Sequence, residues 1–365
     1  MSDEPSSSPA VLEFLVPGDI GAATGGYVYA RQMIAGLRDL GWTVHLHELD
    51  ASFPFPHTAA VKDAAAVLAA LPRGAQVLID GLALGAMPAQ VEVQSSRLRL
   101  GGLIHHPLRL ETGLAPALAQ QLAVSECRAL RSMARVIVTS AATAALLIED
   151  GVPPERVAVV EPGVDAAAQA HRRGRAHAAA VAEWPRLLCV ATLTPRKGHA
   201  LLIAALQGLG HLPWQLDCIG SLERSPEYVL QLREQIDIAG LDARVALRGE
   251  VSAASLVAFY AQADLFVLPT LYEGYCMAVA EAVAHGIPVL STRTGAIPQL
   301  VHAGAGILIE PGDGAALQCV LHELLGQRDR LSRLAELACR PDAGTPRDWG
   351  LAAQELAAAL LCPVT

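Results

Sequence analysis

The most informative stretch of the chain is LPTLYEGYCMAVAEAVAHGIPV, residues 268–289. Its pattern predicts a buried strand, a loop that displays Glu273, and a helix of small residues from about Tyr275 to His285. A glycine and a proline follow the predicted helix, and both residue types end helices. A strand, a loop and a helix in this order are the repeating unit of a parallel sheet with crossover helices.

The same unit recurs along the 365 residues in two series of short apolar runs. The first series covers residues 11–16, 43–46, 76–79, 100–104 and 135–138, and the second covers 186–192, 215–219, 244–247, 265–268, 288–290 and 306–309. Segments with helical spacing, such as Tyr27–Leu40 and Met277–Ala284, separate the runs. The stretch Ala166–Pro185 lies between the series and has no strand pattern.

This organisation predicts an α/β protein of two doubly wound domains, because the chain exceeds the size at which one core usually keeps growing. We place the N-terminal domain at residues 1–170, a linker at 171–185, the C-terminal domain at 186–345 and a final helical segment at 346–365. Ligands of such sheets bind at the carboxyl ends of the strands, so two facing domains predict a cleft there.

Composition excludes several classes of protein. Hydrophobic residues make up 52% and charged residues 17%, which favours a compact globular enzyme over a disordered chain. The net charge is -9 and aromatic residues are only 4%, which argues against a nucleic-acid partner. No apolar run reaches the roughly 18 residues that a membrane-spanning helix needs. Composition therefore predicts a cytoplasmic protein without a transmembrane segment.

The seven cysteines are scattered, and no pair stands at a spacing typical of zinc ligands or of redox motifs. We therefore expect free thiols, most of them buried, in a reducing cytoplasm.

A pair of adjacent cations, Arg196 and Lys197, stands in a turn between a predicted strand and a predicted helix. Only two of the 27 basic residues are lysines, so a lysine beside an arginine in this turn is unusual for the chain. Fixed cations stabilise the negative charge that develops on a departing diphosphate, without a metal ion. The alternative interpretation is a helix start with two solvated cations.

Two carboxylates, Glu273 and Glu281, stand in the loop and the helix of the opening stretch. Exposed amides at a helix start, together with the helix dipole, bind phosphate groups. Glu281 follows about two turns along the helix, so the two carboxylates can contact different parts of one extended ligand. The alternative is an unrelated loop acid and a solvated helix acid.

Two further segments belong to the N-terminal domain. Gly18–Tyr27 is a glycine-rich loop that opens the first helix and lets a backbone approach a ligand closely, although its spacing is not the dinucleotide fingerprint. His105 and His106 end a strand. A zinc site is not predicted there, because no third ligand stands at a suitable spacing. A structural role for the histidines is the alternative.

Together these segments resemble the motifs of the retaining glycosyltransferase family 4, the "glycosyl transferases group 1", and the resemblance extends over nearly the whole chain. It implies the GT-B fold, in which two Rossmann-like domains face a central cleft. The family's two glutamates, with seven residues between them, match Glu273, which would contact donor-sugar hydroxyls, and Glu281, which would bind the ribose. The resemblance assigns backbone amides for the sugar and phosphate to Gly274, Tyr275, Cys276 and Met277. A glycine is more usual where Cys276 stands, which implies a narrower sugar pocket.

The resemblance also implies roles for residues outside this motif. Arg196 and Lys197 would bind the donor diphosphate, and His106 or His105 would contact the donor sugar near the reacting carbon, a choice that the sequence leaves open with His106 as the first candidate. Gly25 and Gly26 match the positions that approach the donor phosphate. Gly220, Gly249 and Val251 match the positions that hold the nucleotide base.

We therefore expect a metal-independent, retaining transfer of a hexose-type sugar from a UDP- or GDP-sugar to a hydroxyl acceptor, with no cofactor. The alternatives are a nucleotide-sugar 2-epimerase and a catalytically silent nucleotide-sugar-binding protein. Through Asp165 the chain carries 11 Lys and Arg against 17 Asp and Glu. This acidic balance favours a neutral or small soluble acceptor over an anionic membrane surface.

Overall fold

The computed structural model describes residues 10–111, 113–165, 168, 183–302, 304–340 and 347–362. The chain forms two compact units, one of Met1–Pro162 with Trp349–Thr365 and the other of Gly163–Asp348. The first unit therefore ends at Pro162, whereas the N-terminal domain was predicted to end at residue 170. Most of the predicted linker at 171–185 lies outside the described residues.

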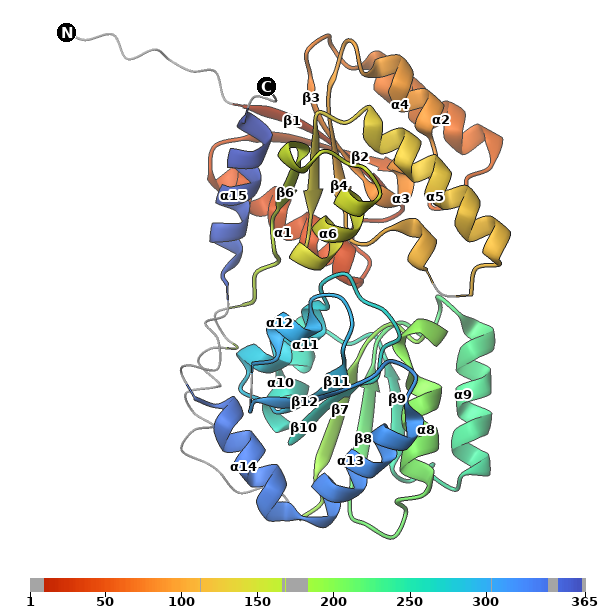
Figure 1. The fold of residues 1–365 in the computed structure, drawn as a ribbon, viewed down its shortest axis with the longest axis vertical. Coiled ribbons are helices and arrows are strands. Elements are labelled where there is room, and N and C mark those ends of the chain that lie inside the picture. The colour runs from red at the N-terminus through yellow and green to blue at the C-terminus, as the bar shows by residue number, and fades with distance from the viewer. Residues whose placement is uncertain are drawn as a thin grey trace, which may run out of the picture. The chain divides into compact units, whose positions relative to one another are not determined.

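The N-terminal unit contains a sheet of six parallel strands in the order β2-β1-β3-β4-β5-β6 (Figure 1). The strands are β1 (Val11–Pro17), β2 (Thr43–Leu49), β3 (Gln76–Asp80), β4 (Arg99–Ile104), β5 (Arg135–Val138) and β6 (Val157–Val159). Its helices are α1 (Gly25–Asp39), α2 (Thr58–Ala70), α3 (Gly81–Leu84), α4 (Pro88–Gln94), α5 (Pro116–Arg131), α6 (Ala141–Glu149) and α15 (Trp349–Leu361). The short edge strand β6 was not predicted, and its three residues are half-buried or exposed.

Helix α15 brings the chain back to the N-terminal unit, where it packs on α1 and β5. A Cβ at Gly36 of α1 would lie 2.4 Å from the Cβ of Ala353, so the glycine permits the close approach of these two helices.

The C-terminal unit contains a second parallel sheet of six strands, in the order β12-β11-β10-β7-β8-β9. The strands are β7 (Arg186–Val190), β8 (Gln215–Ile219), β9 (Val245–Gly249), β10 (Leu265–Leu268), β11 (Val289–Thr292) and β12 (Gly306–Ile309). Its helices are α8 (His199–Gln207), α9 (Pro226–Ile238), α10 (Ala253–Gln262), α11 (Met277–Ala284), α12 (Ile297–Leu300), α13 (Gly314–Gly326) and α14 (Arg328–Ala338). All four residues of β10 are buried, as expected for a central strand with helices on both faces.

Each sheet has a point at which the strand order reverses, and ligands of open α/β sheets bind outside the carboxyl ends of the strands at such a point. In the C-terminal sheet this point lies between β7 and β10, which are hydrogen-bonded neighbours. In the N-terminal sheet it lies between β1 and β3. The prediction of two doubly wound α/β domains is confirmed.

Among the described helices, none combines the length and the hydropathy that crossing a membrane would require.

Candidate active site

The loops that follow β7 and β10 bring three charged side chains together at the reversal point of the C-terminal sheet. The Nζ atom of Lys197 lies 2.5 Å from Oε1 of Glu273, and Nη1 of Arg196 lies 3.5 Å from Oε2 of the same carboxylate. The side chains of Lys197, Arg196 and Glu273 are 16%, 15% and 7% exposed. The sequence named all three residues, and the structure shows that they form one cluster, called here the charged cluster.

The carboxylate of Glu273 is ionised because of its partners. Burial alone would raise the pKa of Glu273, but the charges of Lys197 and Arg196 lower it, as do hydrogen bonds from Lys197 and Thr270. The balance leaves the pKa of Glu273 below its ordinary value. The charged cluster therefore holds two cations and one anion, with a net charge of one positive unit.

Backbone and hydroxyl contacts tie the two loops to each other. The amide of Leu271 donates to the carbonyl of Arg196 at 2.8 Å, and Nη1 of Arg196 donates to the carbonyl of Tyr272 at 2.8 Å. The buried Oγ1 atom of Thr270 lies 3.0 Å from Oε1 of Glu273 and 3.1 Å from the Arg196 carbonyl. These contacts fix the cations relative to the carboxylate.

Glycine is required where the loops around the charged cluster approach one another most closely. Gly198 has φ 75°, and a Cβ there would lie 2.1 Å from the carbonyl oxygen of Pro269. Gly295, after β11, would bring a Cβ within 1.8 Å of the Glu273 carbonyl oxygen. Gly198, Gly295 and Thr270 were not predicted as site residues, because their contacts join segments far apart in the chain.

The helix α11 covers Met277–Ala284, the segment that helical spacing predicts, and does not start at about Tyr275, because Cys276 interrupts the helical backbone. Cys276 has φ 78° and is the one non-glycine residue with positive φ among those described. A side chain in this left-handed region costs about 1–2 kcal/mol. The strain lies at the position where a glycine is more usual, and the Cys276 side chain is buried there.

Glu281 faces the neighbouring helix α10. Its Oε2 accepts a hydrogen bond from the hydroxyl of Tyr260 at 2.8 Å, and the Tyr260 ring stacks on His285 with the ring centroids 4.9 Å apart. Burial raises the pKa of Glu281 to about 7, although the Tyr260 hydrogen bond opposes this. Tyr260 was not predicted from the sequence.

Two of the predicted glycines meet at the ends of β8 and β9. The amide of Gly220 donates to the carbonyl of Gly249 at 3.0 Å, and both residues have positive φ. A Cβ at Gly220 would lie 2.1 Å from the carbonyl oxygen of Ala191 in the loop after β7. Val251 follows β9 and is partly buried against the core of this unit. These residues share the carboxyl edge of the sheet with the charged cluster.

In the N-terminal unit, Gly25 and Gly26 are the first residues of α1. They were expected in the glycine-rich loop that precedes this helix. A Cβ at Gly26 would lie 3.3 Å from Nε2 of His105. The same Nε2 lies 3.6 Å from Oδ2 of Asp80, the buried last residue of β3. The His105 ring also meets the edge of Tyr29, with the ring centroids 5.5 Å apart. His105 thus lies at the reversal point of its sheet.

His106 turns to a different neighbour, since its Nε2 lies 3.3 Å from Oε2 of Glu111. The buried carboxylate of Glu126 contacts the loop after His106, where it accepts a hydrogen bond from the Leu108 amide at 3.1 Å. Burial raises the pKa of Glu126 to about 7.

The cysteines differ from the expectation that most of them are buried. Only Cys189, Cys218 and Cys276 are buried, whereas Cys319 and Cys362 are exposed. Cys189 and Cys218 lie side by side on β7 and β8, although 29 positions separate them in the sequence.

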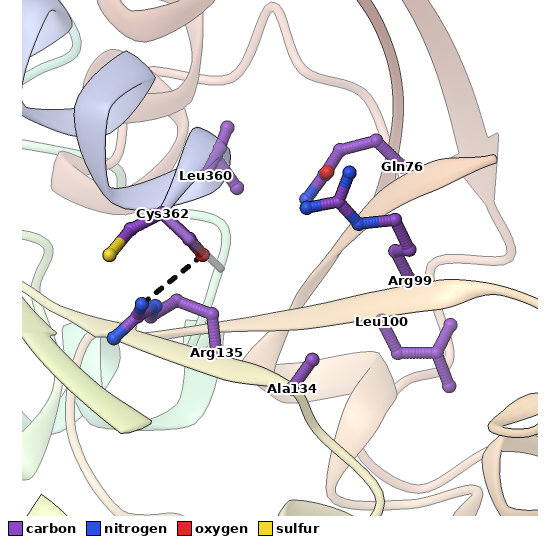
Figure 2. Close-up of a pocket in the computed structure, with 7 residues that line it drawn as sticks. All are labelled: Gln76, Arg99, Leu100, Ala134, Arg135, Leu360 and Cys362. Atoms are coloured by element: carbon purple, nitrogen blue, oxygen red, sulfur yellow. Dashed lines mark hydrogen bonds between the residues drawn. The ribbon is translucent and has the colours of Figure 1, made fainter. Parts of the chain in front are cut away.

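A hollow of about 300 Å³ lies at the opposite edge of the N-terminal sheet (Figure 2). It is lined by Gln76, Arg99, Leu100, Ala134, Arg135, Leu360 and Cys362. Gln76, Arg99 and Arg135 are the first residues of β3, β4 and β5, so the hollow lies at the amino ends of these strands. His105 follows the carboxyl end of β4, and the hollow is therefore separate from the candidate active site.

Comparison with known proteins gives a family match to the C-terminal unit. Residues 184–327 match the family described as "Glycosyl transferases group 1". The chain is 27% identical over 302 residues to an MMP alpha-(1->4)-mannosyltransferase from Mycolicibacterium hassiacum, a match covering 78% of this chain and 70% of that protein. It is 30% identical over 226 residues to a D-inositol 3-phosphate glycosyltransferase from Nocardia farcinica, covering 58% of this chain and 49% of that protein.

Solved structures match over nearly the whole length. The sucrose-phosphate synthase from Thermosynechococcus elongatus has a TM-score of 0.77 at 20% identity, covering 96% of this chain and 98% of that chain. The Anabaena protein HepE, in complex with UDP and glucose, has a TM-score of 0.72 at 20% identity, covering 96% and 99%. The protein therefore has the GT-B fold, and the larger part of its C-terminal unit matches the group 1 glycosyl transferases.

Proposed function

We propose that the protein is a retaining glycosyltransferase that transfers a hexose-type sugar from a nucleotide diphosphate sugar to a hydroxyl acceptor, without a metal ion. The observation that carries the proposal is the charged cluster at the reversal point of the sheet whose sequence matches group 1 glycosyl transferases. The group 1 match favours a transferase over the 2-epimerase alternative.

The cations of the charged cluster would stabilise the departing diphosphate. Arg196 presents a planar fork of donors and Lys197 a point charge, and Glu273 neutralises only one of the two. Both are held by backbone and side-chain contacts before any ligand binds, so little reorganisation is needed as negative charge develops on the leaving group.

Glu273 would also bind hydroxyls of the donor sugar. A carboxylate offers about four acceptor positions. Oε1 already lies near Lys197 and Thr270, whereas the contact of Oε2 with Arg196 is long at 3.5 Å. Oε2 therefore has the capacity to accept a hydrogen bond from a sugar hydroxyl. A contact with the sugar would explain why an ionised carboxylate lies beside the cations that would bind the diphosphate.

The rest of the donor would follow the same edge of the sheet. Glu281, oriented by Tyr260, would accept hydrogen bonds from the ribose hydroxyls. Backbone groups of Gly220, Gly249 and Val251 would contact the nucleotide base, and the stretch Gly274–Met277 would offer amides to the sugar and the phosphates. In HepE the solved complex contains UDP, and some relatives of the chain are named as GDP-mannose-dependent mannosyltransferases. We propose a UDP- or GDP-sugar on this basis.

In the N-terminal unit we propose His105, in preference to His106, as the histidine that contacts the donor sugar. Its ring lies beside Gly26 at the start of α1 and beside Asp80, at the edge of the sheet where ligands bind. Gly25 and Gly26 would let the backbone approach the donor phosphate. His106 would then have a structural role beside Glu111.

No protein nucleophile is assigned in this proposal. The leaving phosphate would accept the proton of the acceptor hydroxyl on the same face of the sugar, so that the anomeric configuration is retained. The acidic balance of the N-terminal sequence supports a neutral or small soluble acceptor, and a nucleotide-sugar donor supports a cytoplasmic location.

A ligand screen followed by product analysis tests the proposal. Thermal shifts with uridine, guanosine, adenosine and thymidine diphosphates and their sugars would identify the donor, because a bound ligand stabilises the folded state. Release of nucleoside diphosphate that depends on an acceptor, with an NMR spectrum showing the donor's anomeric configuration in the product, would support it. Conversion of the nucleotide sugar without an acceptor would favour the epimerase alternative. Binding with no turnover would favour the silent binding protein, and an inverted product would refute retention.

A further inference from the structure

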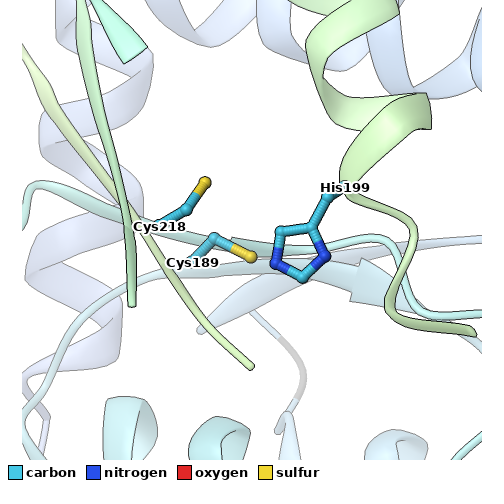
Figure 3. Close-up of side chains that lie close together, drawn as sticks. All are labelled: Cys189, His199 and Cys218. Carbon is cyan, nitrogen blue, oxygen red and sulfur yellow. The ribbon is translucent and has the colours of Figure 1, made fainter. Parts of the chain in front are cut away.

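A second cluster of reactive side chains lies in the interior of the C-terminal unit, behind the loop after β7. Figure 3 shows the thiol of Cys189 directed toward the imidazole of His199, with the side chain of Cys218 beside Cys189. Cys189 on β7 and Cys218 on β8 are direct partners in the strand register, and His199 is the first residue of α8. The potential ligand atoms of the three residues all lie within 4.8 Å of one another.

The histidine of this cluster is unusual for a protein core. The His199 side chain is completely buried, and neither of its ring nitrogens has a hydrogen-bond partner among the described residues. Leaving a buried polar group unsatisfied costs about 1–3 kcal/mol, so such a group calls for a specific explanation. A bound cation would satisfy the ring nitrogen that faces the two sulfurs.

The chemistry of the three side chains fits one class of cation. Thiolates and neutral imidazoles are the preferred ligands of zinc.

We propose that Cys189, Cys218 and His199 form a buried binding site for a thiophilic divalent cation, with Zn²⁺ as the ion that makes the site electrically neutral. Two thiolates and one neutral imidazole carry two negative charges, which Zn²⁺ balances, and a neutral site costs less to bury than a charged one. Whatever protons the two sulfurs still carry leave as the zinc–sulfur bonds form. A water molecule would complete the four ligands.

The geometry is close to what such a site needs. Zinc–sulfur bonds of about 2.3 Å and zinc–nitrogen bonds of about 2.0 Å place ligands of a tetrahedral ion roughly 3.5–4 Å apart. The present separations, all within 4.8 Å, require only small side-chain movements to reach these values.

The consequence for the protein concerns the loop after β7. His199 follows Lys197 by two residues, and the cysteines belong to the two strands beneath the loop. A bound ion would join β7, β8 and the start of α8, and would hold the Arg196–Lys197 turn at a fixed height above the sheet. The ion itself would have a structural role, because all three ligands are buried in the core.

Metal content of the full-length protein tests the proposal directly. After expression in zinc-supplemented medium and gel filtration, we expect about one zinc per chain, and a decrease of about tenfold or more in the Cys189→Ser and His199→Gln variants. Cys319→Ser is the matched control, because Cys319 is exposed and far from the cluster in sequence, and it should retain the wild-type content.

Cobalt provides a second readout that does not depend on the variants folding. Wild-type protein supplied with Co²⁺ in place of zinc should show sulfur-to-cobalt charge-transfer absorption, and Cys319→Ser should show the same spectrum. Less than about a tenth of a zinc per chain with no such absorption would overturn the proposal. A wild-type protein whose mass and peptide map reveal a Cys189–Cys218 disulfide in place of the metal would overturn it as well. Either result would leave the proposed sugar transfer untouched.

Discussion

Replacing Lys197 by methionine should destabilise the protein in a pH-dependent way. Methionine keeps most of the length and apolar surface of lysine but removes the ammonium group that lies 2.5 Å from the buried carboxylate of Glu273. Breaking a buried ion pair from one side costs about 3–5 kcal/mol, because a charge is left uncompensated. Arg196 stays 3.5 Å from the carboxylate and Lys197 is partly exposed, so we expect a loss of about 3 kcal/mol at neutral pH, at the lower end of that range.

The pH dependence follows from the pKa of Glu273. In the wild type this pKa is lowered, so Glu273 stabilises the fold above the pKa that it has in the unfolded chain and loses this contribution as the pH falls through the lowered value. Without Lys197 the burial of Glu273 dominates and should raise its pKa. The ionised carboxylate then destabilises the variant at neutral pH, and protonation relieves the penalty as the pH falls.

Urea denaturation at about pH 7.5 and at about pH 5 measures both effects. The stability difference between wild type and Lys197→Met should shrink by at least about half at the lower pH. Lys62→Met is the matched control, since Lys62 is the other lysine of the chain and is exposed, and it should change stability by less than about 0.5 kcal/mol. Adding Glu273→Gln to Lys197→Met should restore about 2 kcal/mol. A loss for Lys197→Met that equals the Lys62→Met value, or that is the same at both pH values, would refute the reasoning.

Four further predictions concern the donor site and the fold. In calorimetric titrations, Glu281→Gln should weaken the binding of a bare nucleoside diphosphate and of its sugar by similar factors. Glu273→Gln should leave the binding of the diphosphate nearly unchanged but sharply reduce the rate of transfer. Equal losses of diphosphate binding in the two variants would contradict the assigned roles. Cys276→Gly should relieve about 1 kcal/mol of backbone strain and change the ratio of kcat/KM between two donor sugars, and an unchanged ratio would show that the thiol does not border the sugar. Because burial raises the pKa of Glu126 to about 7, wild-type stability should decline as the pH rises from about 4.5 to about 7, and Glu126→Gln should flatten this slope in urea titrations. Turnover should persist in a chelator, because the proposed zinc ion is buried and takes no part in the transfer, and activity restored only by magnesium or manganese would be evidence against metal independence.

The strand positions could be predicted because parallel strands buried on both faces appear as continuous apolar runs. Residues 215–219, 265–268 and 306–309 coincide with β8, β10 and β12, and 135–138 with β5. Boundaries that depend on backbone conformation were less accurate. Helical spacing predicted α11 at Met277–Ala284, but the wider range from about Tyr275 was too long, because the left-handed backbone of Cys276 does not follow from an apolar pattern.

The site residues could be named from the sequence, but their partnerships could not. Local spacing identified Arg196, Lys197 and Glu273, whereas their ion pairs join two loops, and the Lys197–Glu273 pair spans 76 positions. Tyr260 could not be predicted for the same reason, because its hydroxyl donates to Glu281 from the neighbouring helix α10. Nor could the meeting of Cys189 and Cys218 be predicted, because adjacency in a parallel sheet depends on strand order and not on sequence spacing.

The interlocking of the loops after β7 and β10 limits how a protein of this kind can be re-engineered or diverge. A Cβ at position 198 would lie only 2.1 Å from the Pro269 carbonyl oxygen, and Thr270 contacts the other loop, so neither loop can change shape without the other. A chimera that imports residues 269–276 alone from another protein would place a foreign backbone against an unaltered turn. Such a graft should assemble poorly, whereas one that exchanges residues 191–198 and 269–276 as a matched cassette should keep its scaffold. Variation at this edge of the sheet is therefore expected to occur in concert across both loops.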